Sequence, residues 1–415
     1  MKIKPIYTSI LIRFFDSFIK FFLYLIMPFL IGFNNTSEIQ LFLSLIFISS
    51  VFFRFSSEEI MLKKMSTLNY NHDQFKNFIK HTLSIILVSY TFFLILTQIL
   101  VMTTLKDESN LVLQIINEHY IFIIFNSFVF TIISIVSFGL RAIGRINLCI
   151  ILQGTTWPFI LLTLVIFRSS DQYEFDFIVR YFTLFFFFVG LFAAIYFYKH
   201  VLSLKENGKS EVKNELKIDR KNSYIQSIAG LFLNWFPLII FGLFNDSYST
   251  GIFGTYFKIG VGFFYFLLVI DFNAGKILST NFQLNKKNKI QKSFHYYQKF
   301  YIIFSVFTLV GSIIFIYIFN KFFDTSLFDP IFFTFLLIIL CSSIFGPVDI
   351  SLLMLNKEKL RSKCAIYFIS SILLIFTPTT IFFNYDYSLY VFGILFFSNY
   401  LVKYKFIKKE INNII

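Results

Sequence analysis

The residues of this chain best suited to chemistry are charged side chains that interrupt long apolar stretches. In the first stretch, Arg13, Asp16 and Lys20 follow one another at spacings of three and four residues, which places all three on one face of a helix. One interpretation is that this face looks into a bundle of helices and handles a ligand. The other is that the helix begins near Phe14. Arg13 then lies at an interface and Lys20, roughly 10 Å further in at 1.5 Å per residue, reaches back towards water.

Further charges interrupt the apolar stretches of the second half. Lys258 lies inside one stretch, and Asp271 lies towards the other end of the same stretch. A lysine at that depth needs a polar cavity or a partner, which favours a binding role for Lys258. Asp349 follows the pair Gly346-Pro347. A carboxylate beside such a helix break could bind an ion or pair with a lysine.

Arg54 ends the second apolar stretch, with Glu58 and Glu59 one turn further along. It is either a cation that binds a ligand or an anchor where the helix leaves the membrane. The candidate substrate-binding residues are therefore Arg13, Lys20, Arg54 and Lys258. The candidate ion-coupling residues or charge partners are Asp16, Asp271 and Asp349.

Motifs of catalytic and metal sites are missing from the sequence. We find no Gly-x-x-x-x-Gly-Lys-Ser/Thr loop for nucleotides, no His-Glu-x-x-His and no Cys-x-x-Cys, and the 5 His residues are dispersed. The 3 Cys residues lie in or beside apolar stretches, where they are expected to act as small buried apolar side chains. We therefore expect no enzyme activity, no catalytic residues, no metal and no cofactor.

The composition explains where these charges must be held. Hydrophobic residues make up 57% of the 415 residues and charged residues only 14%, and the mean hydropathy is +0.72. Soluble domains carry about 25% charged residues, so lipid must solvate much of this chain. It is predicted to be an all-α integral membrane protein with about 12 transmembrane helices, each of about 20 residues. The predicted helices span residues 10–33, 39–60, 78–105, 119–140, 146–167, 176–198, 224–245, 251–273, 298–320, 328–354, 363–383 and 387–407.

Basic residues alternate between the connections of these helices. Only Lys106, Arg168 and Lys321, three of the 37 basic residues, fall in the connections assigned to one side of the membrane. Because positive charge is retained in the cytoplasm, both termini are predicted to be cytoplasmic. The formal net charge of +14 is thus first a signal of topology, with attraction to anionic membrane lipids as a consequence. Nucleic acid is not an expected partner, because the charges form no compact patch.

The longest hydrophilic run, residues 200–222, divides the chain into two halves of six predicted helices each. We predict an N-terminal lobe at 1–199, a cytoplasmic linker at 200–222 and a C-terminal lobe at 223–415. The linker is either a helix with a basic face for anionic headgroups or a flexible charged segment. Prolines also lie within the apolar stretches, where they are expected to bend helices: Pro28, Pro158, Pro237, Pro347 and Pro378.

Three local stretches, together with this division into six and six helices, resemble a known superfamily. They are Gly251-Ile-Phe-Gly-Thr-Tyr-Phe-Lys258-Ile with the preceding Asp246, Gly346-Pro347 followed by Leu352-Leu-Met-Leu-Asn-Lys-Glu-Lys359, and Leu140-Arg-Ala-Ile-Gly-Arg145. The pattern resembles the multidrug/oligosaccharidyl-lipid/polysaccharide (MOP) exporter superfamily, and in particular its O-antigen and capsule flippases of the Wzx type. The sequence departs from that family at Phe253, where Tyr is common, at Asn356, where Gly is common, and by the lack of a proline near 271–278.

The resemblance implies a MATE-like fold of two six-helix lobes around a central cavity, working by alternating access. It implies that the cargo is an undecaprenyl-pyrophosphate-linked oligosaccharide, an O-antigen (lipopolysaccharide) or capsule repeat unit, moved across the bacterial cytoplasmic (inner) membrane. Basic residues on helices 1, 2 and 8 matter in related lipid flippases, and Arg13, Lys20, Arg54 and Lys258 occupy comparable places. Arg and Lys also suit a pyrophosphate chemically. Aromatic faces such as Trp235, Tyr256 and Tyr265 could stack on sugars or only pack in the membrane.

Two other functions stay open. A MATE-like exporter of drugs coupled to ions is the near alternative, although it would favour acidic over basic residues for cationic drugs. A membrane-embedded polysaccharide polymerase or acyltransferase is disfavoured because the chain lacks a sizeable external loop. Expected partners are the lipid-linked oligosaccharide and membrane lipids, with a polysaccharide polymerase and a chain-length regulator as candidates.

Overall fold

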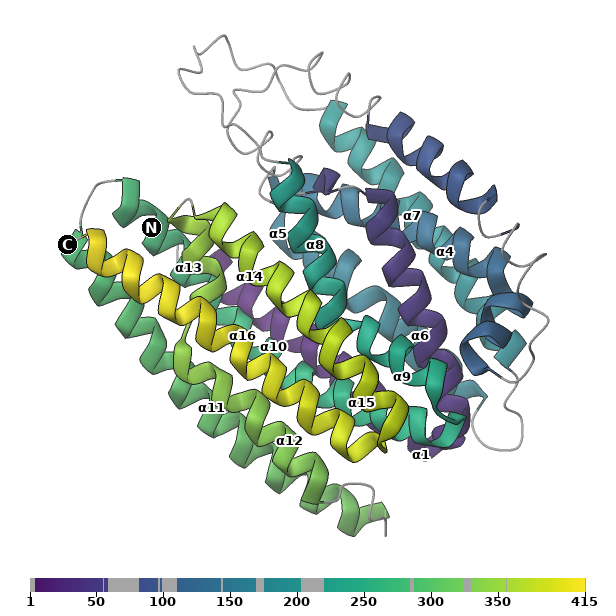
Figure 1. The fold of residues 1–415 in the computed structure, drawn as a ribbon. Helices are drawn as coiled ribbons and strands as arrows, with labels where there is room; N and C mark the ends of the chain where they lie inside the picture. The colour runs from purple at the N-terminus through teal and green to yellow at the C-terminus, as the bar shows by residue number, and fades with distance from the viewer. Residues whose placement is uncertain are drawn as a thin grey trace. The chain divides into compact units, whose positions relative to one another are not determined.

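A computed structural model gives the fold, and it describes residues 4–54, 56–58, 82–95, 98, 110–142, 145–168, 175–202, 220–283, 287–323, 330–355 and 357–414. Throughout these ranges the regular structure is helical (Figure 1). Each of the twelve predicted segments contains helix, which confirms the all-α prediction. The third predicted segment, 78–105, is described as a helix over Thr82–Ile95.

The first two predicted helices meet at a glycine. Helix α1 (Lys4–Arg54) contains Gly32 with φ 77 and ψ 166, a backbone conformation that is not helical and that glycine adopts without steric cost. The purple ribbon of Figure 1 accordingly forms two rods on either side of this point. Because α1 begins at Lys4, Arg13 lies inside a helix that does not start near Phe14. The placement of Arg13 at a membrane interface stays a prediction.

Five of the remaining helices are long enough to cross a bilayer. They are α4 (Leu111–Ala142), α7 (Phe175–Leu202), α10 (Ser247–Gln283), α11 (Lys287–Phe323) and α16 (Tyr385–Ile414). One of them, α4, is kinked at His119, whose φ of -122 and ψ of 15 are not helical. At 1.5 Å per residue, a helix of about 20 residues crosses the hydrocarbon. Seven helices of the described chain are long and apolar enough to span a membrane, or eight if the bent pair α8 and α9 is one span. The chain is thus a multi-pass membrane protein.

The other predicted helices are interrupted. Residues 146–167 comprise α5 (Ile146–Ile150), the π-helical turn η1 (Ile151–Thr155) and α6 (Thr156–Phe167). Helix α8 (Arg220–Asn234) is followed by α9 (Phe236–Phe244) at a bend of 49°. Next come α12 (Pro330–Cys341), the 3-10 turn η3 (Ser342–Phe345) and α13 (Val348–Met354). The last interrupted helix comprises α14 (Glu358–Ser371), the π-helical turn η4 (Ile372–Phe376) and α15 (Thr377–Phe382).

Prolines account for the positions of these breaks. A proline has no N–H and its ring collides with the carbonyl four residues earlier, so a regular helix cannot pass through it unchanged. For Pro158 that earlier residue is Gly154 in η1, and for Pro378 it is Leu374 in η4. The π-helical turns absorb the displaced carbonyls. Pro237 lies just after the break between α8 and α9.

Contacts between Cα atoms group the chain into two compact units. The first contains Met1–Leu231 and Gly242–Gly251, and the second contains Phe232–Phe241 and Ile252–Ile415. Their boundary therefore falls within α8, α9 and α10. Most of the predicted linker 200–222 lies outside the described residues, so the predicted lobe limits stay a prediction.

Small polar residues line the helix packing of the first unit. On α4, the Ser127 hydroxyl donates to the Ile46 carbonyl at 3.1 Å and the Thr131 hydroxyl donates to the Ser50 carbonyl at 3.3 Å, both across to α1. Short side chains let two helix backbones approach closely, and their hydroxyls are satisfied without water. The Phe47 ring packs edge-on against Trp157 with ring centroids 5.1 Å apart.

Phenylalanine rings form the core of the second unit. Phe241 and Phe253 stack with ring centroids 4.4 Å apart, and Phe257 meets Phe392 edge-on at 4.9 Å. All four side chains are fully buried. Such ring pairs contribute about 0.5–1.5 kcal/mol beyond their buried area. Through Phe253 and Phe257 this aromatic core includes α10, the helix that carries Lys258.

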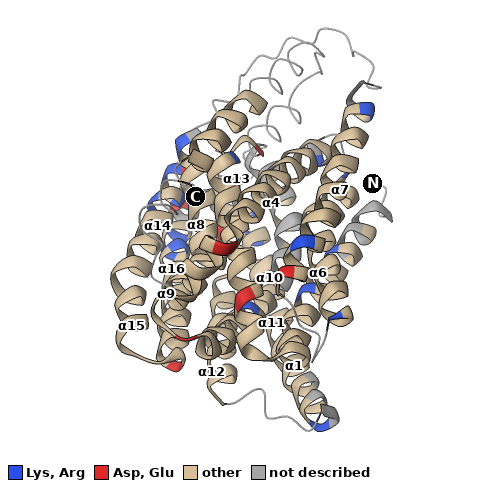
Figure 2. Ribbon diagram, turned by 90° about the vertical axis from the view of Figure 1, so that its right-hand side faces the viewer, with Lys and Arg blue, Asp and Glu red and all other residues tan. Residues whose placement is uncertain are grey.

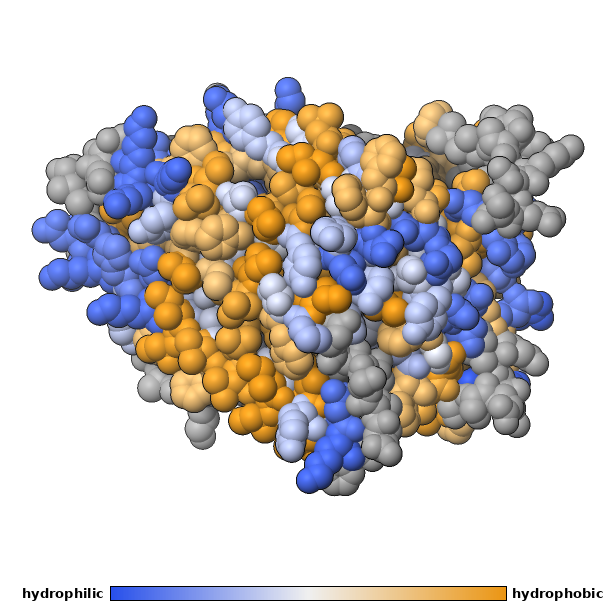
Figure 3. Space-filling model, turned by 60° about the horizontal axis from the view of Figure 1, so that its bottom comes forward, coloured by the Kyte–Doolittle hydropathy of each residue, from blue (hydrophilic) through white to orange (hydrophobic). Residues whose placement is uncertain are grey.

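Many large apolar side chains are exposed on the surface, whereas a soluble protein buries most of them. Large apolar side chains are exposed along α7, including Phe188 and Phe192, and along α11, including Phe307 and Ile314. Figure 3 shows orange, hydrophobic side chains over much of one face. Figure 2 shows mostly tan ribbon with isolated bands of charged residues. Exposed apolar faces of this extent fit a lipid environment.

Candidate functional site

Lys258 on α10 is buried within the second unit, with 8% of its surface exposed. Its Nζ donates a hydrogen bond to the backbone carbonyl oxygen of Asn234. The same Nζ lies 3.1 Å from the centroid of the Trp235 ring and 5.5 Å from that of Phe257. The ammonium is therefore held by a carbonyl and an aromatic face at the break between α8 and α9.

The partners of Lys258 carry no formal charge. Asn234 is the last residue of α8, and the carbonyls at a helix C-terminus carry partial negative charge. The Trp235 ring offers the negative face of its π system. Among the side chains that the structure describes, no carboxylate lies within ion-pair distance of Lys258. The side chain of Asp271, further along α10, lies outside the described residues.

In the first unit, Arg13, Asp16 and Lys20 form one cluster on α1, as their spacing predicts. Asp16 is 2% exposed. Its Oδ1 lies 3.0 Å from Lys20 Nζ, and its Oδ2 lies 3.8 Å from Arg13 Nη1. Lys20 Nζ also donates to Oδ2 at 3.1 Å. One carboxylate thus faces two cations, and the cluster keeps one positive charge in excess.

The π-helical turn η1 packs against this carboxylate. Thr155 Oγ1 lies 3.5 Å from Asp16 Oδ1, at the limit of a hydrogen bond. Gly154 approaches so closely that a Cβ atom placed on it would lie 2.6 Å from Asp16 Oδ2. The position of Asp16 therefore depends on a glycine in the turn. Sequence reasoning missed this contact, because 138 residues separate Asp16 from Gly154 and neither spacing nor charge links them.

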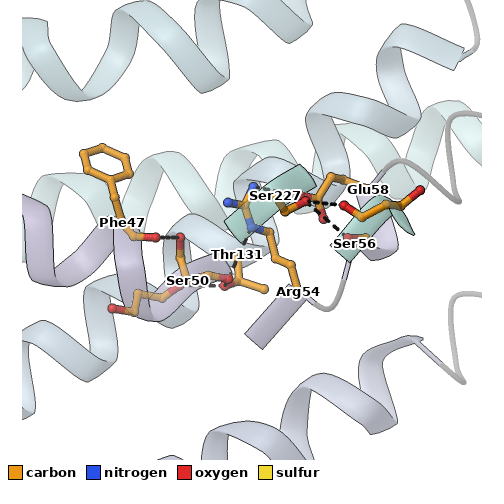
Figure 4. Close-up of polar contacts among 9 residues, drawn as sticks. Phe47, Ser50, Arg54, Ser56, Glu58, Thr131 and Ser227 are labelled. Atoms are coloured by element: carbon orange, nitrogen blue, oxygen red, sulfur yellow. Dashed lines mark hydrogen bonds and ion pairs between the residues drawn. The ribbon is translucent and has the colours of Figure 1, made fainter. Parts of the chain in front are cut away.

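Arg54 is also paired (Figure 4). Its Nη1 lies 3.3 Å from Glu58 Oε1, and both residues are buried. Its Nε donates to the Ser50 carbonyl at 3.2 Å. Its guanidinium lies 5.7 Å from the Phe130 ring centroid. Each of these contacts remains within the first unit. Arg54 and Glu58 neutralise one another.

Asp349, at the first turn of α13, joins three helices of the second unit. Its Oδ2 accepts hydrogen bonds from Arg361 Nη2 at 2.5 Å and Nε at 3.1 Å, and its Oδ1 accepts one from Lys403 Nζ at 2.7 Å. Arg361 comes from α14 and Lys403 from α16. In the sequence, Arg361 and Lys403 are two of the basic residues that lie near connections predicted to be cytoplasmic, and nothing else marks them. A pairing across 54 residues leaves no signal in local spacing.

The four sites therefore differ in charge compensation. Arg13, Lys20 and Arg54 have a carboxylate within 4.0 Å, and Asp349 has two cations. Lys258 differs from the other three predicted binding cations. Its described partners are a backbone carbonyl and an aromatic ring, and neither carries a formal negative charge. No group of three or more His, Cys, Asp or Glu within the described ranges is arranged to hold a metal ion.

No protein-family model and no curated protein match the sequence. Solved structures do match the fold. One is described as the inward-facing conformation of a multidrug resistance MATE family transporter of the MOP superfamily. It has a TM-score of 0.62 and 10% identity, and covers 98% of each chain. The outward-facing conformation of such a transporter has a TM-score of 0.58 and 10% identity, with 98% of this chain and 96% of that chain covered.

A third match is a MOP superfamily transporter from Pyrococcus furiosus, described by the reverse polarity of its binding pocket, which suggests a different function. Its TM-score is 0.52 at 11% identity, with 99% of this chain and 94% of that chain covered. At these identities the likeness concerns the fold. The chain has the all-helical, MATE-like fold of MOP superfamily transporters, which confirms the fold class that the sequence predicted.

Proposed function

We propose that this protein is a flippase that moves an anionic, lipid-linked oligosaccharide across a membrane by alternating access. The cargo class is a polyprenyl-pyrophosphate carrying an O-antigen or capsule repeat unit, as in Wzx-type proteins. The fold supports a transporter, since its solved neighbours are described as transporters. The choice of cargo is supported by the charges inside the membrane helices.

The observation that carries the proposal is the state of Lys258. A cation buried in a membrane helix is costly unless a ligand or partner compensates it. The described partners of Lys258 are the backbone carbonyl of Asn234 and the ring of Trp235. Because both are uncharged, they do not neutralise the lysine. An arriving pyrophosphate supplies that missing negative charge and accepts hydrogen bonds from the ammonium.

The cluster of Arg13, Asp16 and Lys20 has a second role in this proposal. It retains one positive charge in excess and, with Arg13 and Lys20 each about one third exposed, it can still attract an anion. Arg54 is a weaker candidate, because Glu58 already compensates it. Asp349 is assigned to holding α13, α14 and α16 together, since both of its oxygens are occupied. Ion coupling through Asp16 or Asp271 stays a prediction.

The cellular setting follows from the same proposal. We propose that the protein lies in the bacterial cytoplasmic membrane, where Wzx-type proteins act. The distribution of basic residues supports cytoplasmic termini. A polysaccharide polymerase and a chain-length regulator are candidate partners in the same biosynthesis. The proposal assigns transport and no catalysis to the chain.

A drug exporter is the competing function, favoured by the description of two structural neighbours as multidrug resistance transporters. Cationic drugs would require an uncompensated carboxylate. Among the described candidates, Asp16 faces two cations and Asp349 also faces two, so neither offers free negative charge. One structural neighbour is described by the reverse polarity of its binding pocket. We likewise use the sign of the charges to choose between an anionic lipid-linked cargo and a cationic drug.

Transport in liposomes separates the two functions. The purified protein is reconstituted with a fluorescent polyprenyl-pyrophosphate oligosaccharide, and the label that becomes protected from an impermeant quencher is followed over time. Uptake of a cationic dye is measured in parallel vesicles. The proposal expects protein-dependent movement of the lipid-linked anion and none of the dye. Movement of the dye alone would assign the chain to drug export.

A further inference from the structure

We propose that Trp235 is a specificity-determining residue, which positions the Lys258 ammonium without neutralising it and so reserves that charge for an anionic ligand. The inference rests on the proposed function and goes beyond it, because it assigns the selection of an anion to an uncharged aromatic ring. The ligand class is a pyrophosphate group, either free or at the head of a lipid.

The geometry of three residues carries the inference. Lys258 Nζ lies 3.1 Å from the Trp235 ring centroid, so the ammonium is in direct contact with the ring face. The adjacent residue Asn234 accepts a hydrogen bond from the same Nζ through its backbone carbonyl. Both partners come from the break between α8 and α9, where the chain bends by 49°. The break thus presents a carbonyl and a ring to one lysine.

Each partner attracts a cation through partial charges alone. The carbonyl lies at the C-terminus of α8, where helix dipoles favour positive charge. The ring face attracts a cation through its quadrupole. Neither carries a formal charge, so neither cancels the positive charge of the ammonium that it holds. A carboxylate in the same place would form an ion pair, as Glu58 does with Arg54.

The remaining donors of the ammonium suit a pyrophosphate. A lysine ammonium has three N–H donors, of which the Asn234 carbonyl accepts one. The ring requires no directed N–H, because its attraction for the cation is electrostatic. Donors are therefore left for the oxygens of an anion, and such charge-assisted hydrogen bonds are among the strong ones. A cationic ligand would meet an unscreened positive charge and be repelled.

Tryptophan fluorescence offers a direct observation of this contact, because the chain has only 2 Trp residues, Trp157 and Trp235. In a Trp157→Phe background, with excitation at a wavelength that tyrosine does not absorb, Trp235 is the only residue that emits. Inorganic pyrophosphate and a polyprenyl pyrophosphate in detergent serve as the two probes, and they separate a free anion from a lipid headgroup. We expect a saturable change in Trp235 emission with one or both probes, and no change when Lys258→Met is added.

Four substitutions at Trp235 then test whether neutrality matters. Trp235→Phe keeps a ring, Trp235→Leu removes it, and Trp235→Glu and Trp235→Gln form a pair of similar shape that differs in charge. Binding is measured with radiolabelled probe, and folding by size-exclusion chromatography. A ring face contributes modestly to holding a cation. We therefore expect the affinity of Trp235→Phe for the probe to lie within about threefold of that of the unchanged protein, and that of Trp235→Leu to be about tenfold weaker. We expect Glu to bind at least about tenfold more weakly than Gln, because it neutralises Lys258.

The outcomes separate this inference from the proposed function. If Lys258→Met binds both probes as the unchanged protein does, the proposed function and the inference both fail. If Lys258→Met abolishes binding while the Glu and Gln variants bind alike, the inference fails and the proposed function stands. If Glu does not fold, Phe and Leu decide, and equal binding of these two overturns the inference. The inference is also overturned if binding depends on Lys258 but neither probe changes the emission of Trp235.

Discussion

The Nζ of Lys258 donates a hydrogen bond to the carbonyl oxygen of Asn234, which ends helix α8 just before the chain bends into α9. This contact ties α10 to a break that Pro237 imposes on the neighbouring helix. The break supplies a polar group inside an apolar span, and the lysine uses it. Helix interruptions of this kind are tolerated in membranes where another group satisfies the freed backbone.

The contact between Gly154 and Asp16 predicts the effect of adding one methyl group. Gly154→Ala would place a Cβ 2.6 Å from Asp16 Oδ2, so the carboxylate must move away from Lys20. Overpacking of this kind costs about 1–3 kcal/mol. Gly311→Ala is the matched control, because nothing lies within 4 Å of the added atom. Thermal unfolding in detergent measures both variants, and equal melting temperatures would contradict the predicted contact.

Asp349 predicts a larger loss on removal of a charge. Asp349→Asn leaves Arg361 and Lys403 facing one another without their carboxylate. Breaking a fully buried ion pair costs about 3–5 kcal/mol, and partial exposure here lowers our expectation to about 2–3 kcal/mol. Glu410→Gln is the control, because its partner Lys357 is 40% exposed and such pairs contribute at most about 1 kcal/mol. Chemical denaturation compares the two, and a smaller loss for Asp349→Asn would disprove the proposed tie between α13, α14 and α16.

The pair of Arg54 and Glu58 predicts unequal effects of its two members. Arg54→Met loses the Glu58 contact, the bond to the Ser50 carbonyl and the Phe130 ring, whereas Glu58→Gln loses the ion pair alone. Arg54→Met should therefore be the more destabilising by about 1 kcal/mol. A double-mutant cycle should give a coupling energy of about 1–3 kcal/mol. A coupling energy near zero would show that the pair does not form in the protein.

Sequence reasoning predicted the helices because apolar length and charge placement are local signals. The spacing of Arg13, Asp16 and Lys20 likewise predicted their shared face on α1, since a helix repeats every 3.6 residues. Spacing along the chain does not show which residue of another helix will contact a given side chain. Arg361 and Lys403 resembled topology signals, and Trp235 one aromatic among many, until the structure placed them against Asp349 and Lys258.

Membrane topology can be tested across a single span. Helices α14 and α15 with η4 form a span of 25 residues, about 37 Å long at 1.5 Å per residue. Lys359 and Asn384 lie near its two ends and are exposed. In a background without the 3 native Cys residues, Asn384→Cys should react with an impermeant maleimide on intact cells, and Lys359→Cys only after lysis. The reverse pattern would invert the proposed orientation.

The most direct test of the account compares two lysine variants in the liposome assay with the lipid-linked pyrophosphate. Lys258→Met removes a buried lysine that has no carboxylate partner among the described side chains. Lys289→Met is the control, because it removes an exposed lysine of α11. Loss of a charge-assisted hydrogen bond of about 1.5–3 kcal/mol corresponds to affinity about 10- to 100-fold weaker. The account predicts that loss for Lys258→Met and unchanged transport for Lys289→Met. Transport by Lys258→Met with unchanged affinity and rate would contradict it.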